Sequence, residues 1–544
     1  MQMSYRGRLA LAAAVSTLAL SLLPTGPAAA ADYNGLPDGV LTNKTLVIGI
    51  DGASFSALRP ADMPNLQRVR DAGVTSPVNI YADPMAGTWS GPGWATIGHG
   101  VWPDKHRVKV NGDLGGDDVS DPDSDSPGIG SLFRDCPDLP SARCRDYMWT
   151  LEDYNSDIST LVASNWQSVQ NSVFALWDPD AGAFERSADA TIGVEDDADN
   201  VAAVADYLEN GNPDSTFIQI DEVDHVGHGS GNTGPGTTVY QDALKDVDGY
   251  IGQLLDAVEA RPSYEDEDWL IIVTSDHGHK EILGGHGGNT PSERGSFVIA
   301  EGGGLPAGST RYDLKHVDIM PSILAHSGMT TLPPILDGKP FTQVIASADA
   351  FDGLRGSLTT GGGESVPYTG YTTTPPSGWS IDNSQMPSGG TAAWRGWSFA
   401  TDEFWTNADL GQGREENVRA RNVFAVADSD EWDDTSHGTG QFDSTLKSGY
   451  FPVSGSTAQL SFASHYLSDG PQSGTVTVKY YNSSSTQIGS PVVKASYGTA
   501  SADNHNEIKT FPLTLPSGTT KVKVEFRYTG TNSAFWTVDQ VKIQ

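Results

Sequence analysis

The sequence predicts an open α/β domain followed by a β-sandwich. In the N-terminal part, apolar runs that end in an acidic residue alternate with stretches of helical periodicity, which is typical of parallel strands covered by helices. Residues 356–378 are rich in Thr, Gly, Ser and Pro, which indicates a linker. Beyond this linker, apolar and polar residues alternate with a period of two, as in strands that bury one face.

Residues 1–31 have the features of a secretory signal. Arg6 and Arg8 precede an apolar stretch from Leu9 to Leu23, and an alanine-rich cleavage site follows it. The apolar stretch is short for a membrane anchor, and no later segment is long and apolar enough to span a bilayer. We therefore expect a secreted, extracellular protein with a signal at 1–31, a catalytic domain at 32–355, a linker at 356–378 and a β-sandwich, jelly-roll-like domain at 379–544.

The charge and the cysteines restrict the possible partners. The net charge of −36 argues against binding of a nucleic-acid polymer, because the phosphate backbone would be repelled. In an exported chain Cys136 and Cys144 are able to close a small disulfide loop, although the sequence does not decide whether they are bonded. Residues 112–129 are rich in Asp, Gly and Ser and indicate a solvated loop; a calcium site there is an alternative, but the spacing is not that of an EF-hand.

Three apolar runs predict buried strands that end in carboxylates. They cover Thr45 to Asp51, Ser215 to Asp221 and Trp269 to Asp276. Tyr240 to Val258 repeats apolar residues at three- and four-residue steps and predicts a long amphipathic helix, and shorter helices are expected from Met63 to Val74 and from Lys315 to Leu324. In open α/β sheets the site lies at the carboxyl ends of the strands, where these acids are expected.

A hydroxyl and a set of Asp and His residues predict chemistry at that edge. Ser90 precedes a segment that starts a helix, with Pro92 suited to the first turn, and free N–H groups at a helix start attract phosphate. Mixed carboxylate and imidazole ligands suit zinc or a similar divalent ion, and two such ions hold the attacking and leaving oxygens of an in-line displacement. The groups at strand ends are Asp51, Asp224, His228, Asp276, His277 and His286.

Four separated motifs resemble the signature of the alkaline phosphatase superfamily. They are Asp51-Gly, Ser90-x-Pro92, Asp224-x-x-Gly-His228 and Ser275-Asp-His-Gly278. Within the superfamily, the sequence is most similar to the type I phosphodiesterase/nucleotide pyrophosphatase branch, over roughly residues 43–345. The segment from Gly100 to His106 also resembles the family's Gly-Leu-Tyr-Pro-x-x-His motif.

This resemblance implies a sheet with helices on both faces, two divalent metal ions with zinc as the favoured metal, and Ser90 as the catalytic nucleophile. One ion would be held by Asp51, Ser90, Asp276 and His277, and the other by Asp224, His228 and His286. Asn111 matches the asparagine that contacts the phosphate. Because a monoesterase of the bacterial alkaline type would carry an arginine there, Asn111 favours a small phosphodiester as the substrate.

Several assignments have rivals in the sequence. The family nucleophile is usually Thr followed by an aromatic residue that stacks on a base, whereas here it is Ser90 followed by Gly91, which puts a nucleotide substrate in doubt. Thr88 is an alternative nucleophile, and His279 is a rival to His286. The pair of Asp221 and His225 repeats the spacing of Asp224 and His228, which is preferred because Gly227 and Gly229 match the family pattern.

The residues around Ser90 argue against two other classes of hydrolase. A serine esterase would need Gly-x-Ser-x-Gly, and a sulfatase Ser/Cys-x-Pro-Ser-Arg; neither string surrounds Ser90. Trp89, Trp94 and Trp102 suit either core packing or a cation–π wall of the pocket. Glycerophosphodiesters are the leading substrate class, with phosphomonoesters or nucleotides as alternatives. A non-catalytic binding protein is the second alternative, and the C-terminal domain is a candidate for carbohydrate or cell-wall binding.

Overall fold

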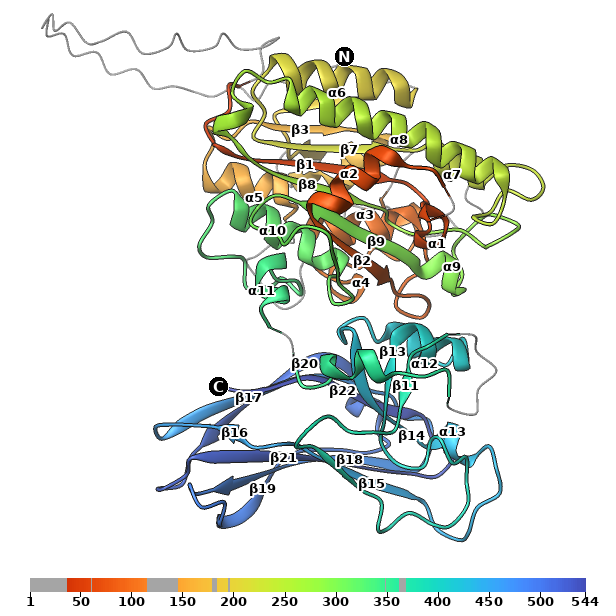
Figure 1. Ribbon diagram of the computed structural model, residues 1–544, viewed down its shortest axis with the longest axis vertical. Helices are drawn as coiled ribbons and strands as arrows, with labels where there is room; N and C mark the ends of the chain where they lie inside the picture. Colours follow the sequence, from red (N-terminus) through yellow and green to blue (C-terminus); the bar gives the residue numbers. More distant parts are fainter. Residues whose placement is uncertain are drawn as a thin grey trace, which may run out of the picture. The chain divides into compact units, whose positions relative to one another are not determined.

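The computed structural model describes residues 37–59, 61–114, 145–178, 183–193, 196–347, 349–361 and 368–544 (Figure 1). The expected signal at 1–31 and both cysteines lie outside these residues, as does most of the Asp-rich segment 112–129. The described chain divides into two units. The first comprises residues up to Val78, Ala86–Gly287 and Ser292–Gln343, and the second comprises Asn79–Met85, Gly288–Pro291 and Val344–Gln544.

The first unit is built on an eight-stranded mixed sheet. Its strand order is β10-β2-β9-β8-β1-β7-β3-β6, and β9 runs antiparallel to β8 while β1 is parallel to both β7 and β8. The strands are β1 (Asn43–Ile50), β2 (Val74–Asn79), β3 (Thr160–Ala163), β6 (Ala190–Ile192), β7 (Ser215–Ile220), β8 (Asp268–Thr274), β9 (Gly295–Glu301) and β10 (Ser309–Thr310). A separate hairpin is formed by β4 (Ala175–Asp178) and β5 (Ala183–Arg186).

Helices cover both faces of this sheet, as expected (Figure 1). On one face Leu46, Ile48 and Ile50 of β1 are buried together with the apolar sides of α2, α6 and α8. On the other face the ring of Trp94 from α3 fits against Gly49, where a side chain would clash with it. The helices are α1 (Phe55–Leu58), α2 (Pro64–Ala72), α3 (Ser90–His99), α4 (Pro103–His106), α5 (Tyr147–Tyr154), α6 (Asp197–Asn210), α7 (Glu222–Gly227), α8 (Thr238–Glu259), α9 (Pro291–Arg294), α10 (Ile319–His326) and α11 (Phe341–Ile345). Short 3₁₀ or π turns lie at η2 (Asn111–Leu114), η3 (Val169–Val173), η4 (Tyr264–Asp266) and η5 (His316–Asp318).

The second unit consists of two antiparallel sheets around one core, in agreement with a β-sandwich. The alternation in the sequence sets the buried face: Val522, Val524, Phe526 and Tyr528 are fully buried. One sheet contains β11 (Tyr371–Thr372), β13 (Ser398–Thr401), β14 (Val423–Asp428), β22 (Phe535–Ile543), β17 (Thr457–Tyr466) and β20 (His505–Thr514). The other contains β12 (Ser380–Asp382), β15 (Phe442–Lys447), β21 (Lys521–Gly530), β18 (Gln472–Tyr481) and β19 (Gln487–Tyr497), with β16 (Phe451–Pro452) beside β21.

The second unit begins earlier than the composition indicates. Phe351 and Leu354 belong to its buried core, next to the turn η6 (Asp352–Ser357), and β11 lies within the expected linker 356–378. Two apolar residues, at 351 and 354, are too few to form a periodic pattern. The Thr- and Gly-rich composition that follows them therefore predicts a linker. Shorter elements complete the unit: α12 (Asp402–Ala408), α13 (Ser429–Asp433), η7 (Arg414–Glu416) and η8 (Ser501–Asp503). No helix among the described residues is both long and apolar enough to cross a membrane.

Candidate active site

The carboxyl ends of three adjacent parallel strands bring the predicted acids together. Asp51 follows β1 directly, Asp276 lies two residues after β8, and Asp224 lies in α7, the helix that follows β7. Since β1 is paired with both β7 and β8, these three ends share one edge of the sheet. The site therefore lies where the sequence places it, at the carboxyl edge of the central strands.

Ser90 is the first residue of α3 and points at this edge. Its Oγ lies 3.1 Å from Nε2 of His277, and the residue is only 6% exposed. Thr88, the rival nucleophile, is fully buried, and its Oγ1 accepts a hydrogen bond from the backbone N–H of Gly287 at 2.9 Å. The geometry favours Ser90 because its hydroxyl, not that of Thr88, faces the imidazole.

The first ligand group comprises Asp51, Asp276 and His277. One oxygen of each carboxylate is held by the protein: Asp51 Oδ2 accepts from Trp94 Nε1 and Gln219 Nε2, both at 2.9 Å, and Asp276 Oδ1 accepts from two backbone N–H groups. The other oxygens, Asp51 Oδ1 and Asp276 Oδ2, are buried and receive no hydrogen bond. They lie 3.6 and 3.3 Å from Nε2 of His277. Both free oxygens thus face the same nitrogen.

The second ligand group comprises Asp224, His228 and His286. The Nε2 atoms of the two histidines are 2.9 Å apart, and each lies 3.4 Å from an oxygen of Asp224. His225, from the rival Asp-x-x-x-His pair, is exposed, and Asp221 takes no part in either group. The structure thus brings together the pair whose flanking glycines match the family motif.

Backbone carbonyls orient two of the imidazoles. His277 Nδ1 donates to the carbonyl of Gly278 at 3.0 Å, and His286 Nδ1 donates to that of Thr88 at 2.8 Å. With the proton on Nδ1, the lone pair of each ring lies on Nε2 and points into the site. This arrangement is the one that metal-binding histidines usually show, because the second nitrogen fixes the ring and its tautomer.

His279 lies between the two groups. It is fully buried, and its Nε2 donates to Asp224 Oδ1 at 2.9 Å. Asp224, His277 and His279 also form a possible set of ligands. The role of His279 is therefore either to bind an ion or to position Asp224, and sequence reasoning saw it only as a rival to His286.

The electrostatics of the site favour a cation. Burial, together with the charge of Asp276, raises the pKa of Asp51 well above its usual range, and burial raises that of Asp276 in the same direction. Burial lowers the pKa of His277 to about 3 and that of His286 well below its usual range, so both rings are neutral. Carboxylates lie close together here, beside neutral imidazoles, and their unsatisfied oxygens and the imidazole lone pairs point at one another. These groups repel each other unless a cation lies between them, as in a divalent metal site. The residues present therefore fit a divalent metal ion.

Asn111 lies beside the nucleophile. Its Oδ1 accepts from the backbone N–H of Gly91, the residue after Ser90, at 2.8 Å. This contact fixes the amide so that its Nδ2 is the group left to donate to a ligand. Trp89 also borders the site: it is half-buried, and its ring meets His286 edge-on at a centroid distance of 5.0 Å. Trp94 and Trp102 are buried in the core.

Gln219 is a site residue that sequence reasoning missed. It is fully buried in β7 and holds Asp51 through its amide. Its signal is a polar residue inside the apolar run of Ser215 to Ile220, at a position that faces Asp51 across the sheet. The indole N–H of Trp94 has the same function, but an indole gives no such signal in a sequence.

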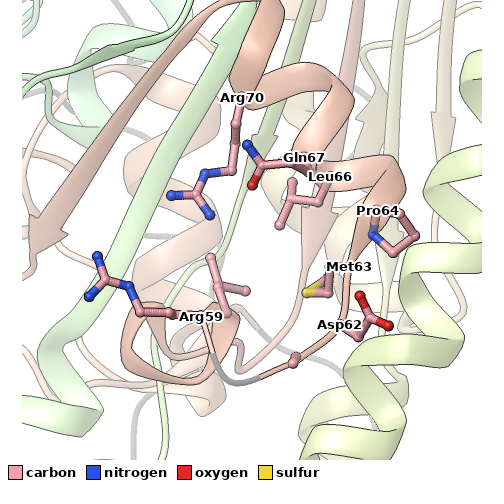
Figure 2. A pocket seen from close by; sticks show the side chains of 9 residues that line it. Arg59, Asp62, Met63, Pro64, Leu66, Gln67 and Arg70 are labelled. Carbon is pink, nitrogen blue, oxygen red and sulfur yellow. The ribbon is translucent and has the colours of Figure 1, made fainter.

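A separate pocket lies away from these residues. It has a volume of about 490 Å³ and is lined by residues of α1, α2 and the segment between them, among them Arg59, Asp62 and Arg70 (Figure 2). It shares no residue with the two ligand groups. The candidate active site is therefore defined by its side chains rather than by this cavity.

Comparison with known protein families finds a match, and it covers the residues of this site. The family model for type I phosphodiesterase/nucleotide pyrophosphatase matches residues 45–316, which is half of the chain and contains both ligand groups. No curated protein matches the sequence.

Solved structures with low sequence identity are also similar. An inactive variant of murine ectonucleotide pyrophosphatase/phosphodiesterase 5, solved in complex with AMP, is 14% identical, with a TM-score of 0.40 over 56% of this chain and 98% of that one. The human protein of the same name is 12% identical (TM-score 0.41; 56% and 98% covered). A protein of the alkaline phosphatase superfamily from Vibrio parahaemolyticus is 14% identical (TM-score 0.37; 56% and 72% covered). On the match to the family model, the chain belongs to the type I phosphodiesterase/nucleotide pyrophosphatase family and is a phosphoric ester hydrolase.

Proposed function

We propose that this protein is a secreted two-zinc phosphodiesterase that cleaves small phosphodiesters by attack of Ser90. The observation that carries the proposal is the position of Ser90 Oγ, 3.1 Å from the imidazole of His277 and beside two groups of Asp and His side chains. A serine in this position is able to form a covalent intermediate that divides a difficult displacement into two easier steps.

The two ligand groups identify which residues would hold the metal ions. Asp51, Ser90, Asp276 and His277 would hold one, and Asp224, His228 and His286 the other. When bound, two such ions supply positive charge that favours the ionised form of the serine hydroxyl and stabilises the oxygens that attack and leave. Carboxylate and imidazole together favour zinc over calcium or magnesium, which prefer oxygen ligands alone.

The chain supplies the nucleophile and the substrate contacts. Ser90 forms a bond to phosphorus while the bond from phosphorus to the leaving alcohol breaks. Water then attacks the phosphorylated serine, which releases the product and restores the hydroxyl. Asn111 Nδ2 donates to a non-bridging phosphate oxygen, since its Oδ1 is already occupied by Gly91. The start of α3 adds backbone N–H groups that favour the anion.

The substrate class follows from charge and shape. A diester phosphate carries one negative charge, and the neutral amide of Asn111 suits it. A monoesterase gains from a guanidinium clamp on the second charge, and none of the site residues named above is an arginine. Gly91 provides no ring for a nucleobase, which argues against nucleotides, whereas Trp89 beside His286 offers an aromatic face for the cation of an alkylamine or the C–H groups of glycerol. Glycerophosphodiesters are therefore the proposed substrates.

The proposal that the protein is secreted rests on residues 1–31 alone. N-terminal sequencing of the protein from a culture medium is expected to show cleavage after the alanine-rich segment that ends at Ala31. Recovery of the intact N-terminus inside cells would contradict it.

The substrate proposal is tested by specificity constants measured side by side. We expect a glycerophosphodiester to exceed both a dinucleotide and glycerol phosphate in kcat/KM. A dinucleotide that wins would overturn the interpretation of Gly91. A monoester that wins would overturn the role given to Asn111, while leaving the two-metal serine chemistry intact.

A further inference from the structure

The pocket between α1 and α2 lies in the first unit and contains none of the metal-ligand residues; we call it the α1–α2 pocket (Figure 2). Its volume of about 490 Å³ suits a small organic molecule, because ligand pockets usually measure about 300–1,000 Å³. Four buried apolar side chains form its apolar floor: Leu58, Ala61, Met63 and Leu66. The pocket therefore offers a hydrocarbon surface to a ligand.

Arg59 and Arg70 add two guanidinium groups to this pocket. In Figure 2 both groups extend to one side, and the carboxylate of Asp62 lies on the other. Within the described part of the chain, neither guanidinium has a carboxylate at ion-pair distance; Arg70 Nε donates to Thr75 Oγ1 at 3.3 Å. That contact orients the Arg70 side chain and leaves its two terminal nitrogens available to a ligand.

Arg68, in the same helix, shows what the acidic chain usually supplies. Its two terminal nitrogens lie 3.1 Å from Asp256 and 2.6 Å from Glu259. The chain has 69 acidic and 33 basic residues, so a partner for each arginine is abundant. Two guanidinium groups on one pocket repel each other, and an anion held by both offsets this repulsion. Arg59 and Arg70 thus have the charge of an anion site and lack a protein carboxylate to fill it.

The start of α2 does not compete for such an anion. The backbone N–H groups of Asn65 and Leu66 already donate to the carboxylate of Asp248, at 3.0 and 2.8 Å. Asp248 belongs to α8 and is buried. The free N–H groups that attract anions to a helix start are therefore occupied, and the arginines are the groups left to bind one.

We propose that the α1–α2 pocket binds a small organic anion, with its carboxylate or phosphate group on Arg59 and Arg70 and its hydrocarbon part on the apolar floor. The planar guanidinium fork matches two oxygens of either anion. Asp62 repels an anionic group from the opposite side, so the charged end of the ligand is restricted to the arginines. This site is separate from the two metal-ligand groups, and its occupancy does not depend on the proposed phosphodiesterase activity.

The test titrates the zinc-loaded full chain with phenylphosphonate and with benzoate by calorimetry. Neither probe has a phosphoester bond, so neither is consumed, and the pair distinguishes a phosphate-like from a carboxylate ligand. We expect one or both to bind with a dissociation constant below about 1 mM, which is within reach of a ligand of this size. The constant should be the same after chelation, because the arginines keep their charge when zinc is removed.

Three results of this titration would count against the proposal. No binding of either probe would overturn it, and so would binding that disappears on chelation, because the probe would then sit on the metal ions. Inorganic phosphate and acetate lack the hydrocarbon part and should bind at least tenfold more weakly than the corresponding probe. Equal binding of these small anions would overturn the role given to the apolar floor.

Variants locate the anion. Arg70→Gln is expected to weaken binding of the probe at least tenfold, while zinc content and phosphodiesterase activity stay unchanged. The matched control is Arg68→Gln, which removes the same charge from the same helix and should bind like the wild type. If Arg70→Gln does not fold, the exposed Arg59 is replaced by Gln instead. Unchanged binding in the folded variant, or an equal loss in Arg68→Gln, would place the anion elsewhere and overturn the assignment.

Discussion

Ser90 Oγ lies 3.1 Å from Nε2 of His277, although 187 positions separate the two residues. The contact depends on two local features: α3 begins at Ser90, and the Nδ1 of His277 is occupied by the carbonyl of Gly278. The imidazole lone pair is thereby turned to the hydroxyl. This one relationship joins the predicted nucleophile to the predicted metal ligands.

Replacement of the nucleophile should abolish turnover. We expect Ser90→Ala to lower kcat/KM by about three powers of ten or more, because removal of a covalent nucleophile removes the whole pathway. Thr88→Ser, which keeps the hydroxyl that binds Gly287, is the control and should stay close to the wild type. If Ser90→Ala remains active and Thr88→Ala is dead, the nucleophile is two residues earlier.

Asn111 should contribute as a neutral donor. In Asn111→Asp the side chain keeps its shape and still accepts from Gly91, but it loses the Nδ2 donor and adds a negative charge beside the phosphate. We expect a fall in kcat/KM of about 10²-fold or more on a diester, comparable with the loss of one transition-state donor. Circular dichroism should show an unchanged fold. An active Asn111→Asp enzyme would place the phosphate elsewhere.

The two rival histidines should differ in their effect on metal content. His286 Nε2 lies with His228 and Asp224, whereas His279 donates to Asp224. We expect His286→Ala to retain one zinc ion instead of two. His279→Ala should retain two, with affinity about 10–100-fold weaker, as for loss of a group that orients a ligand. Elemental analysis after dialysis measures both, and the reverse result would make His279 the ligand.

Zinc binding should release protons and weaken as the pH falls. The pKa values of Asp51 and Asp276 are raised, so protons compete for the oxygens that the metal needs, and they compete more strongly at low pH. His277, with its pKa lowered to about 3, is neutral throughout and adds no proton. Calorimetry at pH 6 and pH 8, in buffers of different ionisation enthalpy, measures the protons released. Affinity that is independent of pH, with no proton release, would contradict the raised values.

Much of the fold was predictable because its signals are local. The runs ending at Asp51, Asp221 and Asp276 form adjacent parallel strands, and the alternation of Val522 to Tyr528 sets the buried face of a sandwich strand. The start of the second unit was not predictable, because Phe351 and Leu354 join its core through contacts with distant strands. A few apolar residues beside a Gly-rich segment carry no periodicity.

The candidate site was likewise predictable only in part. The family resemblance placed Asp224 with His228, and Ser90 with His277. It gave no account of Gln219 and Trp94, which hold Asp51 from β7 and α3, because hydrogen bonds between distant elements leave no spacing in the sequence. Nor did it separate the roles of His279 and His286, which requires the direction of each ring nitrogen.

The measurement that tests the central claim most directly is hydrolysis of bis-p-nitrophenyl phosphate and p-nitrophenyl phosphate by the full chain, before chelation, after chelation and after addition of zinc. We predict that the diester exceeds the monoester in kcat/KM by more than about tenfold, some 1.4 kcal/mol in transition-state binding. Activity should vanish with the metal and return with zinc. A monoester preferred tenfold, or diester turnover that survives complete removal of metal, would contradict a two-metal serine phosphodiesterase.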